Sequence, residues 1–187
     1  MIRAGAISKG VFLLVKDEPH VVVEREFVNP GKGSAFVRLK LKSLVTGQVL
    51  KQVNKSQENL EDINVEAREV QFLFADAEQF HFMDLETYEQ FTMPIEGHED
   101  KRLFILEGET VQLSFWDEKP IDILLPYKVV LTVTEAREGL RGDTVSGATK
   151  PVTLETGLVV KVPLFIKEGD KILVNSETRE YVERVNA

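Results

Sequence analysis

The strongest constraint on the fold of this chain is an alternation of apolar and polar residues with a period of two. In residues 37–42 the apolar side chains alternate with the cations Arg38, Lys40 and Lys42. Because successive side chains of a β-strand point to opposite faces, this pattern predicts half-buried strands. Similar runs occur at residues 70–74 and 111–115, with turn residues between them, whereas Val130 within the run 129–133 is also apolar and suggests a strand covered on both sides. We therefore expect an all-β fold of small barrels or sandwiches.

Helical periodicity is scarce. The best candidate for a short helix is the segment 98–106, which follows the helix breakers Pro94 and Gly97. Within it, Leu103 and Leu106 are spaced to face a core.

The composition excludes several classes of site. The chain of 187 residues contains no cysteine, which excludes a disulfide scaffold, a thiol nucleophile and a thiolate metal site. Its three histidines are far apart in sequence, so we expect no metal site and no histidine-based catalytic triad. No secretion signal is visible, and no stretch approaches the roughly 20 apolar residues of a membrane helix. The expected protein is soluble and cytoplasmic, without a membrane partner.

Charge is distributed unevenly and suggests three domains. The net charge is −8, made of +3 in residues 1–64, −11 in residues 65–126 and 0 in residues 127–187. The acidic middle argues against simple nucleic-acid binding there, since phosphate-binding proteins are usually basic. Each of these three segments has about 60 residues, which is near the lower size limit for a domain that folds independently. We therefore expect the three domains to pack against one another.

The segment Asn29–Ser34 (NPGKGS) is the most informative loop. Proline restricts the chain, whereas glycine permits conformations closed to other residues, so the loop can be both shaped and thin. It carries one long cation, Lys32. The pattern alone favours Lys32 as a solvated hairpin residue over a functional cation. A phosphate-binding P-loop is excluded because Glu26 stands where that motif requires glycine.

Several motifs resemble those of the bacterial translation elongation factor P family. They cover the chain in order, at residues 27–36 (FVNPGKGSAF), 80–84 (FHFMD), 86–90 (ETYEQ), 141–151 (RGDTVSGATKP), 156–157 (TG), 162–165 (VPLF) and 180–185 (EYVERV). The residue before the loop proline is often lysine in this family, and here it is Asn29. The position that carries the charge at the tip is retained as Lys32.

The resemblance implies a fold and a function. The expected fold is three small β-barrels in an L shape: an SH3-like (KOW-type) barrel over 1–64, an OB-fold over 65–126 and a second OB-fold over 127–187. The expected protein is not an enzyme and has no cofactor. It binds the 70S ribosome beside the P-site tRNA, stimulates peptide bond formation and relieves stalling at consecutive prolines, acting as a monomer.

The resemblance also implies roles for individual residues. Lys32, extended by a lysine-modifying enzyme, would contact the CCA end of the P-site tRNA. The residues presenting it would be Asn29, Pro30, Gly31, Gly33 and Ser34. Further RNA contacts are expected in the first barrel at Arg38, Lys40 and Lys42, and in the third at Gly142, Asp143, Thr144, Lys150, Tyr181 and Arg184. Three of these have structural alternatives, because Tyr181 can be a core or barrel-rim aromatic and Asp143 and Thr144 can form an ordinary turn cap.

Other function classes fit the residues less well. A generic OB-fold binder of single strands needs aromatic residues interleaved with basic ones, whereas the phenylalanines of the middle segment stand among acids. An enzyme needs a nucleophile with a base, or a metal cluster, and neither pattern is present. A diverged elongation factor P-like paralogue departs from the Pro-Gly-Lys-Gly loop, which this sequence keeps.

Overall fold

The computed structural model describes residues 1–136 and 147–185. These residues form strands and two short 3-10 helices, with no α-helix in the described ranges, which confirms the predicted all-β fold. None of the described helices is long and apolar enough to cross a membrane. The chain divides into two compact units, one made of Met1–Glu99 and Thr110–Leu124, the other of Asp100–Glu109 and Leu125–Ala187.

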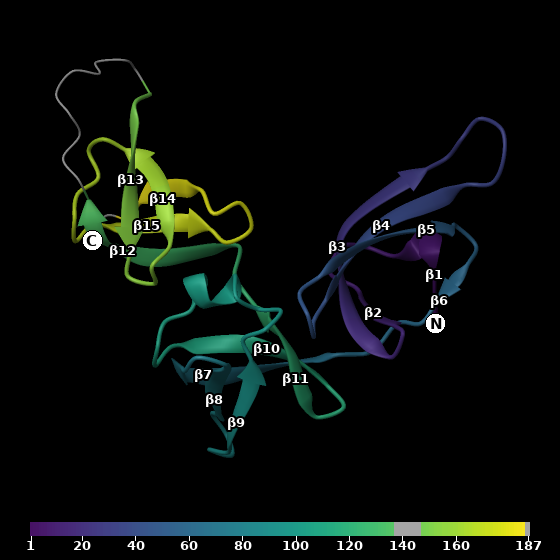
Figure 1. Cartoon of the computed structure of the whole chain (residues 1–187), viewed down its shortest axis with the longest axis horizontal. Coiled ribbons are helices and arrows are strands. Elements are labelled where there is room, and N and C mark those ends of the chain that lie inside the picture. The colour runs from purple at the N-terminus through teal and green to yellow at the C-terminus, as the bar shows by residue number, and fades with distance from the viewer. Residues whose placement is uncertain (137–146, 186–187) are drawn as a thin grey trace. The chain divides into compact units, whose positions relative to one another are not determined.

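The first unit begins with a small antiparallel barrel (Figure 1). Its elements are β1 (Ile2–Arg3), η1 (Ala4–Ala6), β2 (Phe12–Val15), β3 (Glu18–Val28), β4 (Phe36–Ser43), β5 (Val49–Lys55) and β6 (Asn59–Leu60). Strands β2 to β5 pair in sequence order, and β1 pairs with β6. The buried core of this barrel consists of Ala4, Ile7, Leu13, Val22, Val37, Leu39 and Leu41.

The alternation along β4 separates the two faces of the sheet as predicted. Val37, Leu39 and Leu41 are buried in the barrel core, and Arg38 between them is exposed. Burying each of these aliphatic side chains contributes about 1.5–3 kcal/mol. The register to β3 is therefore strongly specified, since a slip of one residue would place the core residues in water.

The rest of the first unit is a five-stranded antiparallel sheet in the order β11-β10-β7-β8-β9. Its strands are β7 (Glu66–Ala75), β8 (Gln79–Asp84), β9 (Gln90–Pro94), β10 (Thr110–Trp116) and β11 (Lys119–Leu124). Phenylalanine rings pack against one another on this sheet: the Phe82 ring is tilted against Phe72, with centroids 5.6 Å apart, and stacked with Phe91, with centroids 5.8 Å apart. The phenylalanines that stand among acids in the sequence thus include a core cluster.

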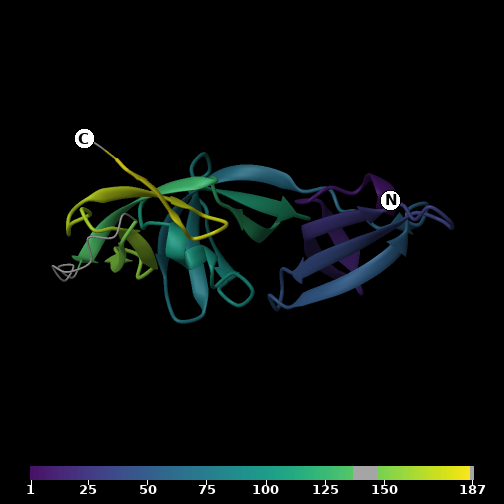
Figure 2. The ribbon, with the colours of Figure 1, turned by 90° about the horizontal axis from the view of Figure 1, so that it is seen from above.

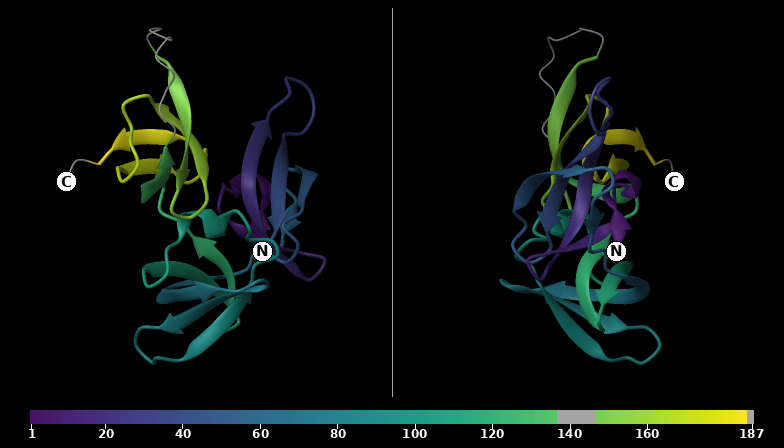
Figure 3. Two further views of the ribbon diagram at one scale, coloured as in Figure 1. Left: turned by 60° about the vertical axis from the view of Figure 1, so that its left-hand side comes forward. Right: turned by 90° about the vertical axis from the view of Figure 1, so that its right-hand side faces the viewer.

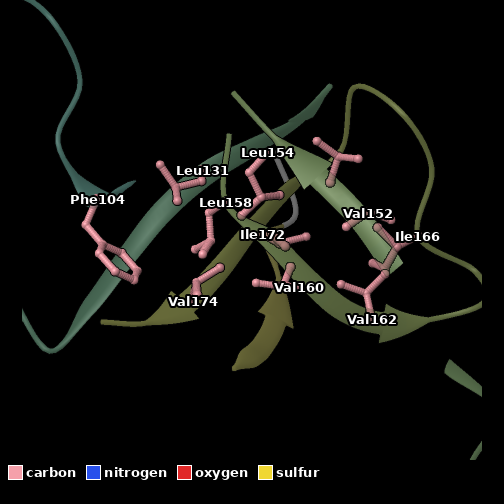
Figure 4. Packing of buried hydrophobic residues seen from close by; sticks show 11 residues of the cluster. Phe104, Leu131, Val152, Leu154, Leu158, Val160, Val162, Ile166, Ile172 and Val174 are labelled. Atoms are coloured by element: carbon pink, nitrogen blue, oxygen red, sulfur yellow. The ribbon is translucent and has the colours of Figure 1, made fainter. Parts of the chain in front are cut away.

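The second unit is another five-stranded antiparallel sheet, in the order β14-β13-β12-β15-β16. Its elements are η2 (Lys101–Phe104), β12 (Lys128–Ala136), β13 (Thr149–Leu154), β14 (Val159–Pro163), β15 (Lys171–Asn175) and β16 (Tyr181–Arg184). Leu131 and Val133 are buried in a core that also receives Val160 and Val174, and Leu131, Val160 and Val174 are labelled in Figure 4. Val130 is 44% exposed, so the prediction that this strand is covered on both sides is wrong.

The segment Asp100–Glu109 belongs to this second unit. The short helix predicted over 98–106 is present only as the four-residue 3-10 helix η2, and Phe104 from it enters the core shown in Figure 4. Leu103 and Leu106 pack against the same core, as predicted, and the Thr156 hydroxyl donates a hydrogen bond of 2.8 Å to the Leu103 carbonyl. The domain boundaries expected at residues 64 and 126 stay predictions.

Candidate functional site

The site predicted around Lys32 is the loop that joins β3 and β4. The two strands pair continuously from His20 opposite Ser43 to Val28 opposite Phe36, apart from a bulge after Val22. The loop of residues 29–35 lies at the free end of this long hairpin in Figures 1 and 2 and in both views of Figure 3. Lys32 is exposed there. The structure thus carries the predicted loop residues together at one tip.

Glycine has a different function at each of its two positions in the loop. Gly33 has a φ of +106°, a conformation that side chains rarely adopt. Gly31 has no such requirement, and a Cβ atom added to either glycine would meet no atom of the chain within 4 Å. The lack of a side chain at Gly31 is therefore not explained by internal packing. It keeps the tip thin and its backbone open to approach.

The base of the loop is flanked by two pairs of arginine and phenylalanine. The Arg25 guanidinium lies 5.5 Å from the ring centroid of Phe27, and that of Arg38 lies 5.4 Å from the ring of Phe36. Since Phe36 pairs with Val28 and not with Phe27, the two pairs lie on opposite faces of the hairpin. Phe27 is 45% exposed. Each face of the hairpin therefore presents a cation held against an aromatic ring beside the loop.

Two of the three cations predicted to contact RNA on β4 have acidic partners on β3. Arg38 donates a 3.1 Å hydrogen bond to Glu26, and Lys40 forms an ion pair with Glu24. These pairs lie directly across the strand register. The exposed face of the hairpin is therefore less basic than the sequence of β4 alone indicates. Lys42, the third predicted cation, is half-buried.

One cation of this face was missed by the sequence analysis. Lys51 on β5 stands opposite Lys40 in the register and lines the same shallow depression as both ion pairs. Lys51 lies on the exposed face of β5 together with the apolar Val49 and Val53, so the sequence pattern gave no signal that this face points outward.

The residues predicted to contact RNA in the second unit are not all described. Gly142, Asp143 and Thr144 lie outside the described residues. The others are Lys150 on β13, Tyr181 on β16 and Arg184 on β16.

Two of these described residues have local contacts. Tyr181 is half-buried and packs against the core of the second unit, which agrees with its structural alternative. Arg184 is exposed, 3.7 Å from the Asp170 carboxylate and 6.0 Å from the Phe165 ring centroid. Arg184 is thus accessible at the surface, whereas Tyr181 contributes to packing.

The histidine on β8, His81, contacts two neighbouring side chains. His81 Nε2 lies 2.7 Å from the Asp76 carboxylate, and the imidazole stacks on Phe74 with ring centroids 4.2 Å apart. The hydrogen bond with His81 lowers the pKa of Asp76 to about 2, assisted by the backbone N–H groups of Glu78 and Gln79. No group of three or more histidine and acidic side chains with metal-site geometry occurs among the described residues.

Family comparisons match three consecutive parts of the chain. Residues 3–60 match the KOW-like domain of elongation factor P, residues 65–123 its OB domain, and residues 129–184 its C-terminal domain. The KOW-like domain, the OB domain and the C-terminal domain of one translation elongation factor thus match this chain in that order.

Relatives extend this similarity over the full length. Elongation factor P of Treponema denticola is 51% identical over 187 residues, covering all of both chains. The same protein of Treponema pallidum is 50% identical over 186 residues, again covering both chains. Elongation factor P of Borrelia hermsii is 52% identical, covering 98% of this chain and 97% of its own. The chain belongs to the elongation factor P family.

Among solved structures, eukaryotic translation initiation factor 5A from Methanococcus jannaschii aligns with 66% of this chain and 92% of its own. Its TM-score is 0.47 and its sequence identity 22%. The family assignment rests on the sequence relatives.

Proposed function

We propose that this chain is a non-enzymatic translation elongation factor that binds the 70S ribosome beside the peptidyl-tRNA, between the P and E sites. There it stimulates peptide bond formation and relieves stalling at consecutive prolines. Membership of the elongation factor P family supports this role. As a translation factor, the protein would act in the cytoplasm, as a monomer and without a metal or cofactor.

The observation that carries this proposal is the exposed side chain of Lys32 at the free end of the β3–β4 hairpin. An amine presented in this way can reach a partner that the barrel itself cannot enter. Gly31 and Gly33 add no side chains beside it, so a narrow crevice can admit the tip. The meeting point of the tRNA ends on the ribosome is a crevice of this kind.

The proposed mechanism is positional. Proline is a stiff and poor amine nucleophile, so the reacting ends can rest in an unproductive geometry. The Lys32 ammonium donates hydrogen bonds to oxygen atoms of the CCA backbone and restrains the P-site tRNA. Holding reactants in alignment can lower a barrier by several kcal/mol, about 7–11 kcal/mol in the best intramolecular cases. No proton needs to move between the factor and the reacting groups.

We further propose that a lysine-modifying enzyme acts on Lys32. The amine is accessible, and the residues Asn29, Pro30 and Ser34 that shape the loop lie at the surface or are only partly covered. A longer arm with additional amines would reach deeper and donate more hydrogen bonds than the bare side chain.

The remaining RNA contacts are proposed at the phosphate backbone. Arg38 and Lys40 would exchange their pairs with Glu26 and Glu24 for phosphate oxygens. Exposed ion pairs contribute only about 0–1 kcal/mol, so this exchange costs little. Lys42 would add to this surface. In the third domain the proposed contacts are Gly142, Asp143, Thr144, Lys150, Tyr181 and Arg184.

The test is a Lys32→Ala variant in a translation reporter that contains three consecutive prolines. Because the side chain is exposed, we expect an unchanged melting temperature together with a loss of rescue. The matched control is Lys161→Ala, an exposed lysine on β14, which should rescue like the unsubstituted protein. Equal rescue by Lys32→Ala would remove the basis of the proposal. Intact-mass spectrometry of protein from its native cells would identify any group added to Lys32.

A further inference from the structure

One hydrogen-bonded turn recurs three times in the described chain, at Ser43–Gln48, Asp84–Glu89 and Asn175–Glu180. In each, a side-chain oxygen of the first residue accepts hydrogen bonds from the N–H groups of the third and fourth residues. The N–H of the fifth residue donates to the carbonyl of the first, and the N–H of the first to the carbonyl of the sixth. These turns close the β4–β5, β8–β9 and β15–β16 hairpins.

The fifth residue of each turn has a left-handed backbone. Gly47 has a φ of +74°, Tyr88 of +59° and Arg179 of +60°. Glycine adopts this conformation without steric cost, whereas a residue with a Cβ atom does so only at a cost in free energy. The turn therefore favours glycine, as in the first barrel. Tyr88 is the bulkiest departure from that preference.

Packing within the chain does not offset the cost at Tyr88. Its side chain is 71% exposed, and the neighbouring Leu85 is 38% exposed. Strained residues cluster at sites that act on a partner. Tyrosine is also among the residue types that most often dominate the energy of protein interfaces. A tyrosine kept at a strained and exposed turn points to a contact outside this chain.

The charged side chains around Tyr88 indicate which kind of partner could bind there. Glu86 and Glu89 on either side of it are exposed, and the parts of the first unit at residues 65–99 and 110–124 carry a net charge of −10, from 12 acidic and 2 basic residues. Backbone N–H groups of Thr87 and Glu86 lower the pKa of Asp84, which therefore remains an anion at the base of the turn. Such a surface repels a nucleic-acid backbone. A lysine or arginine fits it, since a cation can stack on the ring and pair with the carboxylates.

We propose that Tyr88, with Glu86 and Glu89, docks onto a Lys/Arg-rich segment of a protein at the ribosomal binding site. This proposal rests on the proposed function, because the partner is expected where the factor binds. It differs from the role of Lys32 in its place, its residue types and the class of macromolecule contacted.

Substitutions separate docking from a structural role. Tyr88→Asn introduces a residue that tolerates the left-handed conformation, so its melting temperature should be no lower than that of the unsubstituted protein. Its affinity for purified 70S ribosomes should fall about tenfold or more, as at an interface hot spot. The control is Tyr127→Asn, at a tyrosine that is 60% exposed, which should leave the affinity unchanged. Unchanged affinity of Tyr88→Asn would overturn the proposal.

Photo-crosslinking identifies the partner class. A benzoylphenylalanine is placed at position 88, and co-sedimentation with ribosomes is measured before irradiation. A crosslink from the bound factor to a lysine- and arginine-rich protein segment would support the proposal. A crosslink to RNA, or none despite co-sedimentation, would overturn it while leaving the proposed function intact. Failure to co-sediment, in the unsubstituted protein as well, would overturn both.

Discussion

The close approach of two glycines gives a quantitative test of packing in the first unit. Gly47, in the turn after β4, and Gly97, in the loop after β9, meet backbone to backbone. A Cβ atom added to Gly47 would lie 2.9 Å from the Gly97 Cα atom, and ordinary contact begins near 3.4 Å. The Gly47→Ala substitution therefore requires the two backbone segments to move apart by about 0.5 Å to restore ordinary contact.

The expected loss of folding stability in Gly47→Ala has two parts. Gly47 has a φ of +74°, and a side chain in the left-handed region costs about 1–2 kcal/mol. The steric overlap adds about 1–3 kcal/mol, the usual range for overpacking. The total for Gly47→Ala is then about 2–5 kcal/mol. Gly10 has a φ of +88° but no atom within 4 Å of an added Cβ, so Gly10→Ala should cost only the backbone part.

Urea unfolding can measure the difference between these two variants. Trp116, the single tryptophan of the chain, lies on β10 in the same unit as both glycines, so its fluorescence reports on that unit. We expect Gly47→Ala to lower the free energy of unfolding by about 1–3 kcal/mol more than Gly10→Ala does. Equal losses in the two variants would show that the contact with Gly97 carries no steric cost, and the reasoning would be wrong.

Two further predictions concern charged side chains. The folded-state pKa of Asp76 is depressed to about 2 by His81, so its stabilising contribution is complete above pH 4 and is lost as the pH falls towards 2. Acid unfolding of Asp76→Asn should show a weaker pH dependence in that window, and identical profiles would contradict this. Glu24→Gln with Glu26→Gln releases two paired cations and should strengthen binding to an RNA duplex at low salt, with a steeper salt dependence. Binding that stays unchanged in a filter assay would show that this face does not contact RNA.

The local sequence pattern predicted much of the fold, because in a strand with one buried face every second side chain is buried. Val37, Leu39 and Leu41 could be assigned to a core from their spacing alone, and Leu103 on η2 and Leu106 just after it could be placed against a core in the same way. For the candidate site, the sequence indicated the loop around Lys32 through its proline and glycines.

The partners of side chains could not be predicted in the same way. Arg38 and Lys40 looked like free cations, but the β3–β4 register, including the bulge after Val22, brings Glu26 and Glu24 opposite them. His98 likewise gave no signal, yet it is buried with Nε2 2.9 Å from the Ile121 carbonyl oxygen. Such contacts join residues from different strands or loops, so they depend on pairing and on bulges that no local pattern encodes.

By itself, the sequence determined the strands, the thin loop with its single lysine and the membership of a family, since all three depend on residue types at short spacings. Only the tertiary structure decided which charges are paired, that Phe104 packs into the core of the second unit, and that Tyr88 stands exposed in a strained turn. The physical reason is that burial and hydrogen bonding are properties of atoms that meet in space, whereas periodicity is a property of neighbours along the chain.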